Sequence, residues 1–184
     1  MGAFSIRIVK PNVTPQDAVR FFAAPGLSSL YWNLRSGPLR RIADIYVPFW
    51  LYRVSYALPR AAPARFFALD AVDGSLDLFE FPHLPAENQM LVLETRNVLK
   101  PFLTEARAEQ ILREKVLRVI FQQGFFKLRT LNLEVSSKAH ELYLPYWLGI
   151  YGRGGTVRCR VMDAVRRRIE GAKASTFFEQ WLAA

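Results

Sequence analysis

Two aspartates in matching contexts are the residues whose type and spacing best suit catalysis in this chain. Asp70-Ala71-Val72 matches Asp163-Ala164-Val165, 93 residues later. If the two carboxylates met, they would share a proton, and one would act as acid and the other as base. An aspartate that ends a strand more commonly accepts backbone hydrogen bonds in the following turn. We favour the turn role, so the sequence predicts no catalytic residue.

Other signatures of enzymes and metal sites are missing from the sequence. The histidines, His83 and His140, have no Cys, His or carboxylate partner at ligand spacing, and zinc needs about four such ligands. The single cysteine, Cys159, cannot form an intrachain disulfide and is expected on a buried strand. Gly152-Arg153-Gly154-Gly155 has the glycines of a turn but no following Lys-Ser/Thr or helix. We therefore expect no metal and no cofactor.

Four aromatic residues recur in one pattern and are the candidate ligand-binding residues. Tyr46-Val47-Pro48-Phe49-Trp50-Leu51 matches Tyr143-Leu144-Pro145-Tyr146-Trp147-Leu148. Tyr46, Trp50, Tyr143 and Trp147 would line a shared apolar groove for a peptide, a lipid or a stacked base. The alternative is that these side chains form the two hydrophobic cores, because Trp and Tyr bury large areas.

Basic residues gather in the second half of the chain. Residues 1–92 carry a net charge of +2 and residues 93–184 carry +7. Alternate residues of a strand share a face, so a basic stripe is expected to bind phosphates. Its candidates are Lys127, Arg129, Arg158, Arg160, Arg166, Arg167 and Arg168. The alternative is a solvated outer face of a sheet.

A third matching block indicates an ancient tandem duplication. Lys10-Pro11-Asn12-Val13-Thr14 matches Lys100-Pro101-Phe102-Leu103-Thr104 at a shift of 90. The Tyr46 and Asp70 blocks then recur in the same order, at shifts of 97 and 93. Thr14 and Thr104 are typical helix N-caps. They predict helices over about 15–23, which Ala24-Pro25-Gly26 ends, and over about 105–122.

The remaining elements follow from local patterns. Pro48 and Pro145 lack an N–H donor and predict an edge, a strand start or a bulge that aims the following Trp. Asp73-Gly74 between two apolar runs over 67–81 predicts a hairpin, and Val157 to Val165 repeats its first strand. From Glu170 onward, apolar spacing predicts a C-terminal helix.

These elements predict an α+β fold of two tandem β-α-β-β(-β) repeats with antiparallel meander sheets, related by a pseudo-twofold axis. Repeat unit 1 spans 1–83, a linker spans 84–93, and repeat unit 2 with the C-terminal helix spans 94–184. The Asp70–Gly74 turn after a helix and a Tyr-bearing strand resembles the PepSY-type module. That resemblance implies a helix with strands and a binding or inhibitory role.

Composition limits the remaining classes. Hydrophobic residues make up 51% and charged residues 22%, which argues against disorder. No apolar stretch is long enough to span a bilayer, and we expect a cytoplasmic protein. The favoured function is a non-enzymatic binding module for a protein, a peptide or an apolar molecule. Nucleic-acid binding through the basic second half is the alternative, and an enzyme using the aspartate pair is the least favoured.

Overall fold

The computed structural model describes residues 2–56, 64–122 and 133–183. Helices and a mixed β-sheet are both present, so the predicted α+β class is confirmed. The elements are β1 (Phe4–Val9), α1 (Pro15–Ala23), α2 (Leu27–Ser36), β2 (Leu39–Tyr56), β3 (Ala64–Asp70), β4 (Phe79–Phe81), η1 (Glu87–Gln89), β5 (Met90–Thr95), α3 (Glu105–Gln122), β6 (Leu133–Arg153), β7 (Thr156–Asp163), β8 (Arg168–Ile169) and α4 (Ala172–Ala183).

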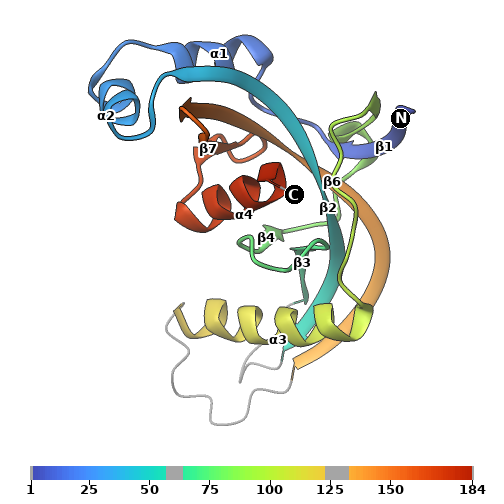
Figure 1. Cartoon of the computed structure of the whole chain (residues 1–184). Coiled ribbons are helices and arrows are strands. Elements are labelled where there is room, and N and C mark those ends of the chain that lie inside the picture. The colour runs from blue at the N-terminus through green and yellow to red at the C-terminus, as the bar shows by residue number, and fades with distance from the viewer. Residues whose placement is uncertain (1, 57–63, 123–132, 184) are drawn as a thin grey trace.

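Two long antiparallel strands, β2 and β6, form the centre of the sheet. The strand order is β4-β3-β2-β6-β1-β5, and β7 pairs with β6 and β8. Figure 1 shows β2 and β6 curving together around α4, with α1 and α2 near one end of the curve and α3 near the other. Alternate residues of β2 contact different helices, because Val47 and Phe49 lie in the cluster that includes α4, whereas Trp50 and Val54 lie in the cluster under α3.

The pairing of β2 with β6 is symmetric about one residue pair. Val47 lies opposite Leu144, and these two residues occupy the same place in the matching blocks. On either side, Tyr46 pairs with Pro145 and Pro48 pairs with Tyr143. A local twofold axis through the Val47–Leu144 pair would exchange these contacts.

The outer neighbours of the two long strands recur at matching positions. Tyr46 forms a parallel bridge with Val98, and Tyr143 pairs in parallel with Ile8, 90 residues before Val98. The antiparallel neighbours β3 and β7 also match, because Phe49 of β2 pairs with Asp70 and Tyr146 of β6 pairs with Asp163. These contacts are consistent with the predicted pseudo-symmetry, and the duplication itself stays a prediction.

Pro48 and Pro145 lie inside central strands, so the predicted edge or bulge at these residues is wrong. The register shifts of the β2–β6 pair occur between Leu39 and Arg41 and between Leu51 and Tyr52. Tyr46 bonds to Asn97 and Leu99 on the side of β2 away from β6, and Pro48 shares that orientation because strand bonding alternates. The Pro48 carbonyl accepts a bond from Ala71, while its nitrogen needs no acceptor.

The segments that lead into α1 and α3 cross over between the two halves of the sequence. The backbone N–H groups of Asn12 and Val13 donate to the Ala164 carbonyl, at 2.8 and 3.1 Å. Those of Phe102 and Leu103 donate to the Ala71 carbonyl, at 2.8 and 3.0 Å. Each segment therefore docks on a turn from the other half of the chain.

Packing of the helices follows the same crossover. Ala18 and Phe22 of α1 pack with Met162 and Ala164 from the second half. In turn, α3 buries Leu112 and Val116 against Val54, Phe67 and Leu69 from the first half. The predicted boundaries at 1–83 and 94–184 follow the sequence repeat, whereas the packing crosses them. The predicted linker, 84–93, contains η1 and most of β5, which pairs with β1.

Local signals placed α1, α3 and α4 correctly but not α2. The Thr14 side chain accepts a bond from the Asp17 N–H, and the Asp17 carboxylate accepts from the Thr14 N–H, which forms a capping box. The helix starting at Glu105 follows Thr104, whose Oγ1 accepts from the Arg107 N–H at 3.4 Å. The predicted spans 15–23 and 105–122 and the C-terminal helix are confirmed.

The paired part of the predicted Asp73-Gly74 hairpin is shorter than expected, and its loop is longer. β3 ends at Asp70, and β4 begins only at Phe79, with Phe66 paired to Phe81. The Asp70 carboxylate accepts bonds from the N–H groups of Asp73, Gly74 and Leu76. The intervening residues therefore wrap around a side chain instead of forming a two-residue turn.

Candidate functional site

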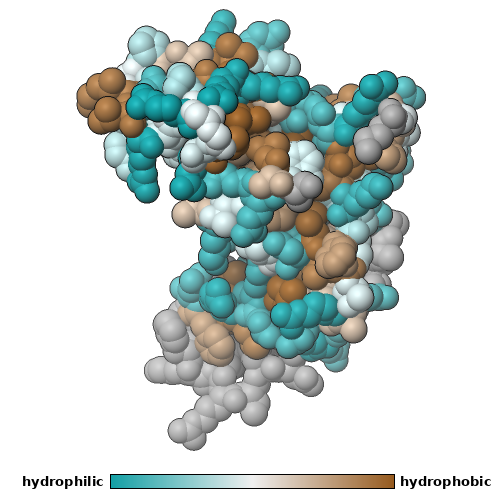
Figure 2. All heavy atoms as spheres, viewed as in Figure 1, coloured by the Kyte–Doolittle hydropathy of each residue, from teal (hydrophilic) through white to brown (hydrophobic). Residues whose placement is uncertain are grey.

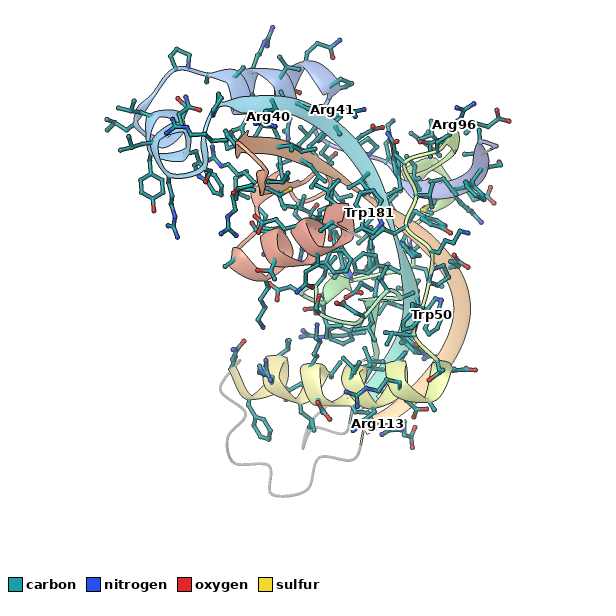
Figure 3. All side chains as sticks on the ribbon, viewed as in Figure 1. Arg40, Arg41, Trp50, Arg96, Arg113 and Trp181 are labelled. Atoms are coloured by element: carbon teal, nitrogen blue, oxygen red, sulfur yellow. The ribbon has the colours of Figure 1, made fainter. Side chains whose placement is uncertain are left out.

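The four candidate aromatic residues do not line a single groove. Tyr46 and Tyr143 meet in one cluster with Ile6 and Ile8. Trp50 packs in the cluster under α3, whereas Trp147 packs in the cluster under α1. Figure 3 shows Trp50 close to α3, at the end of the curved sheet away from α1 and α2. The two tryptophans thus lie in different clusters and the two tyrosines share one, and a binding role for these residues stays a prediction.

The polar tips of Tyr46, Tyr143 and Trp147 form hydrogen bonds within the chain. The hydroxyls of Tyr46 and Tyr143 donate to Asp44 and Glu141, at 3.0 and 2.6 Å. Burial, together with these carboxylates, raises the pKa of both tyrosines well above the usual value. The Trp147 indole donates to the Val13 carbonyl at 3.3 Å, which ties β6 to the start of α1. These contacts are those of structural side chains.

Asp70 and Asp163 organise turns. Both are buried, and Asp70 accepts the three backbone bonds described above. Asp163 accepts bonds from the N–H groups of Val165 and Arg166, both at 2.8 Å. Burial raises the pKa of Asp70, and its backbone hydrogen bonds oppose that shift. The arrangement is the turn role that the sequence favoured.

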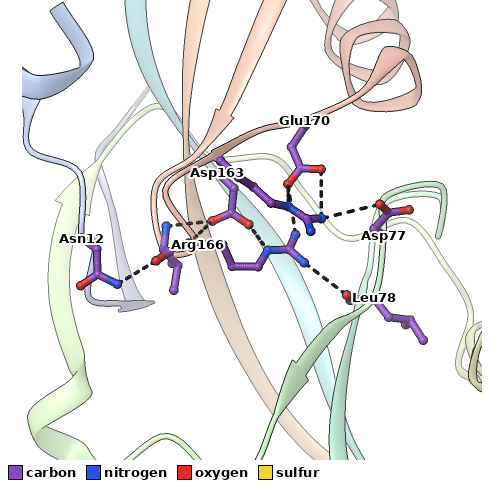
Figure 4. Close-up of polar contacts among 8 residues, drawn as sticks. Asn12, Asp77, Leu78, Asp163, Arg166 and Glu170 are labelled. Atoms are coloured by element: carbon purple, nitrogen blue, oxygen red, sulfur yellow. Dashed lines mark hydrogen bonds and ion pairs between the residues drawn. The ribbon is translucent and has the colours of Figure 1, made fainter. Parts of the chain in front are cut away.

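Two residues of the triple arginine, Arg166 and Arg168, are engaged by carboxylates of the same chain. The guanidinium of Arg166 lies 2.5 Å from Asp163 and 3.2 Å from Glu170 (Figure 4). Arg168 bonds to Glu170 at 2.9 Å and lies 3.7 Å from Asp77, and its bond to Glu170 raises its pKa. These pairs neutralise much of the charge that the sequence assigned to a phosphate-binding stripe.

The other basic candidates are spread among different environments. Arg158 forms an ion pair with Glu179 of α4 at 2.9 Å. Arg160 lies over the ring of Phe21, with 4.5 Å between its guanidinium carbon and the ring centroid. Arg167 takes a left-handed backbone conformation (φ 57°) in the turn before β8. Lys127 and Arg129 lie outside the described residues.

The helix α2, which the sequence analysis missed, carries its large apolar side chains on its solvent face. We define the α2 face as Leu27, Leu30, Tyr31 and Leu34, whose spacing places them on one side of the helix. Leu27 is 88% exposed and Leu34 is 81% exposed. Figure 2 shows these hydrophobic atoms gathered over α2, at the upper left of the molecule. An exposed apolar surface of this kind marks an interaction site.

The opposite side of α2 packs against the rest of the protein and carries fewer apolar side chains than the α2 face. Trp32 contacts Tyr151, with 5.3 Å between the ring centroids, and Ser36 is buried. Gly37 ends the helix at φ 89°, and a Cβ there would lie 2.7 Å from the Gly152 backbone. The helix is therefore inverted, because Trp32 and Ser36 face inward while three leucines face water.

Arginines are frequent in and next to α2. Arg20 and Arg35 are exposed on α1 and α2. Arg41 is exposed at the start of β2 (Figure 3). Arg40 donates to the carbonyls of Gly152 and Gly154, at 3.0 and 3.3 Å. Arg35 contacts the α2 face itself, because it donates to the Tyr31 hydroxyl at 2.6 Å.

A cavity of about 380 Å³ lies between α2 and α4. Tyr31, Trp32 and Arg35 line it from α2, and Ser175 and Thr176 line it from α4. Burial and the neighbouring Glu179 raise the pKa of Cys159, which lies on β7 near this region, to about 12. The cavity leaves α2 supported along only part of its inner side.

The spacing of the α2 face was readable in the sequence, because Leu27, Leu30, Tyr31 and Leu34 follow the helical period. Ala24-Pro25-Gly26 was interpreted only as the end of the preceding helix. Which side of such a helix faces solvent depends on contacts with Trp32 and Ser36, and these contacts are tertiary.

Comparisons with protein-family models, curated proteins and solved structures found no match. The resemblance to PepSY-type modules therefore stays a prediction. Within residues 2–56, 64–122 and 133–183, no helix combines the length and hydrophobicity that crossing a membrane requires. Nor do His, Cys, Asp and Glu residues of these segments form a group of three that suits a metal.

Proposed function

We propose that this chain is a binding module that attaches to an anionic lipid surface through the α2 face. The observation that carries this proposal is the inversion of α2, whose three leucines point into water while Trp32 and Ser36 point inward. Amphipathic helices that lie in the membrane interface use such an apolar side. A lipid belongs to the apolar ligands that the sequence suggested.

Burial of the leucines supplies the attraction. Removing a leucine side chain from water yields roughly 1.5–3 kcal/mol when burial is complete. Leu27, Leu30 and Leu34 start from exposures of 88%, 64% and 81%, so most of that free energy is still available. Tyr31, with its ring beside a hydroxyl, suits the headgroup boundary.

The charge around the face favours anionic lipid over a second copy of the chain. Residues 15–41 contain four arginines, and Asp17 is their only acidic residue. The Asp17 carboxylate accepts hydrogen bonds from the Thr14 N–H and hydroxyl, and these bonds lower the pKa of Asp17. Two such arginine-rich segments would repel each other in a symmetric dimer, whereas anionic headgroups attract them.

Sedimentation with lipid vesicles tests the proposal. We expect the protein to bind vesicles of phosphatidylcholine with phosphatidylserine, and to bind less to phosphatidylcholine alone. The variant L27Q/L30Q/L34Q should lose at least about tenfold in partitioning, because it removes most of the apolar area. The matched control L91Q/V92Q/F102Q changes three other exposed apolar residues and should retain binding.

Equal binding by the two triple variants would contradict the proposal, as would a wild-type protein that stays in the supernatant with both lipids. Sedimentation equilibrium gives a second check. If the wild type forms a dimer that L27Q/L30Q/L34Q abolishes, the α2 face contacts another copy and the lipid assignment is wrong.

A further inference from the structure

A second surface lies in the cleft between α3 and the beginning of α4, far along the sheet from α2. Its volume is about 420 Å³. Figure 2 shows the molecule hollowed between these helices, with hydrophilic side chains around the hollow. We define the cationic cleft by the charged residues that line it, which are Asp77, Lys115, Arg118, Arg166, Arg168 and Lys173.

Five basic side chains therefore line the same space, but carboxylates already pair with Arg166 and Arg168. The remaining positive charge comes from Lys115, Arg118 and Lys173. Lys115 and Arg118 lie three residues apart on α3, so they share one side of that helix. Lys173 reaches the cleft from the first turn of α4. Arg118 and Lys173 are exposed, and neither forms an ion pair with a described residue.

The floor of the cleft is held in place by hydrogen bonds. Arg166 is fixed by Asp163 and Glu170 and also donates to the Leu78 carbonyl at 3.4 Å. Its guanidinium carbon lies 4.5 Å from the centre of the Phe79 ring. Arg168 is fixed by Glu170 and Asp77. Both guanidinium groups are thus positioned before any ligand arrives, which reduces the entropy cost of binding.

Lys115 lies partly buried at the edge of the cleft, where its ammonium group donates to the Leu76 carbonyl. Burial is the main cause that lowers the pKa of Lys115, while Asp70, Asp77 and Asp73 oppose that shift and Lys173 adds to it. Among the described residues, the cations of the cleft without a carboxylate partner are therefore Arg118 and Lys173, and these two are the donors available to an anion.

We propose that the cationic cleft binds a small polyanion of the di- or triphosphate type. The volume is that of a small-molecule site, and the cations approach from α3, α4 and the turn before β8, as an extended anion requires. Lysine and arginine are the usual donors to phosphate oxygens. The proposal is independent of lipid binding, because it uses different residues.

Calorimetric titration with tripolyphosphate tests this site. We expect saturable binding by the wild type that weakens as salt concentration rises. R118E/K173E should weaken binding at least about tenfold, since each substitution removes a charged donor and adds a repelling carboxylate. K10E/R96E has the same change in net charge at exposed residues outside the cleft and should stay within about twofold of the wild type. Arg96 lies on the opposite side of the molecule from the α3–α4 cleft in Figure 3.

Two results would overturn the assignment. The first is the absence of measurable tripolyphosphate binding at low salt. The second is an equal loss in R118E/K173E and K10E/R96E, which would show a response to net charge alone. A single-stranded oligonucleotide provides a further arm. If it binds while tripolyphosphate does not, and R118E/K173E leaves its affinity unchanged, nucleic acid uses another surface and the cleft proposal fails.

Discussion

Val47 lies directly opposite Leu144 at the centre of the β2–β6 pairing, and both side chains are buried in the largest hydrophobic cluster. Contacts on one side of this pair have counterparts on the other. The Ala71 N–H donates to the Pro48 carbonyl, and the Ala164 N–H donates to the Pro145 carbonyl. Because the segments before α1 and α3 also cross over, both halves contribute to each helix-covered core.

Truncation at this pair should destabilise the whole chain. Leu144→Ala removes buried methyl groups from the centre of the sheet and leaves a cavity. We expect the free energy of unfolding to fall by about 2–5 kcal/mol, measured by urea denaturation. Val92→Ala is the control, because Val92 is 75% exposed on β5. A change at Val92 as large as that at Leu144 would contradict this account of the core.

The ion pair of Asp163 with Arg166 should contribute more than a surface pair. Asp163→Asn keeps the shape of the side chain but leaves a buried guanidinium with less compensation, although Glu170 remains. We expect a loss of about 2–3 kcal/mol in the free energy of unfolding. Glu80→Gln breaks the more exposed pair with Arg65 and should cost about 1 kcal/mol or less. Equal losses in the two variants would show that burial is not the deciding factor.

Gly37 should tolerate no side chain, because two separate costs add there. Its φ is 89°, and an added Cβ would meet the Gly152 backbone at 2.7 Å. Gly37→Ala should therefore lower the free energy of unfolding by more than about 2 kcal/mol. Gly154→Ala is the matched control, since φ there is 64° but no atom lies within 4 Å of the added Cβ. Its expected loss is about 1 kcal/mol, from strain alone. Thermal or urea denaturation of both variants separates the two costs, and equal losses would contradict the close approach.

Cys159 should be unreactive in the folded protein. The side chain is fully buried, and burial raises the pKa of its thiol to about 12, so little thiolate forms near neutral pH. A chromogenic disulfide reagent should modify Cys159 slowly at pH 8 and rapidly after denaturation by guanidinium chloride. Fast modification of the native protein would show that β7 opens readily.

The raised thiol pKa also gives a pH dependence with a definite sign. The folded state holds the proton more tightly than the unfolded state, whose thiol has a pKa of about 9. The contribution of Cys159 to stability is thus complete below about pH 9 and is lost as the pH rises toward about 12. Cys159→Ala should remove this part of the slope in urea denaturation series measured at increasing pH. An identical slope in the wild type and the variant would contradict the raised pKa.

Much of the local structure could be predicted from the sequence. Thr14 and Thr104 marked the helices that start after them, and apolar spacing marked α4. The Asp73-Gly74 pattern was less reliable, because the Asp70 carboxylate competes for the backbone donors of a tight turn. The edge or bulge predicted at Pro48 was wrong because a proline fits inside a central strand where its nitrogen needs no hydrogen-bond acceptor.

The candidate binding residues divide in the same way. The aromatic blocks were found because they repeat, but only the structure shows that Trp50 and Trp147 enter different cores. The sequence shows that Arg166 and Arg168 are charged. Their ion pairs with Glu170 could not be predicted from it, because these pairs depend on the geometry of the turn before β8. Arg118 and Lys173, which complete the cleft, carried no pattern in the sequence.

The sequence by itself determined where α1, α3 and α4 form and which blocks repeat. Helix caps, helical periods and repeated motifs all depend on residues near one another in the chain. The tertiary structure decided that α1 and α3 cross to the opposite halves, that α2 turns its leucines outward, and that cations from α3, α4 and the turn before β8 share one cleft. Those outcomes depend on contacts between residues far apart in sequence, such as Val13 with Ala164 and Gly37 with Gly152, and no local pattern specifies them.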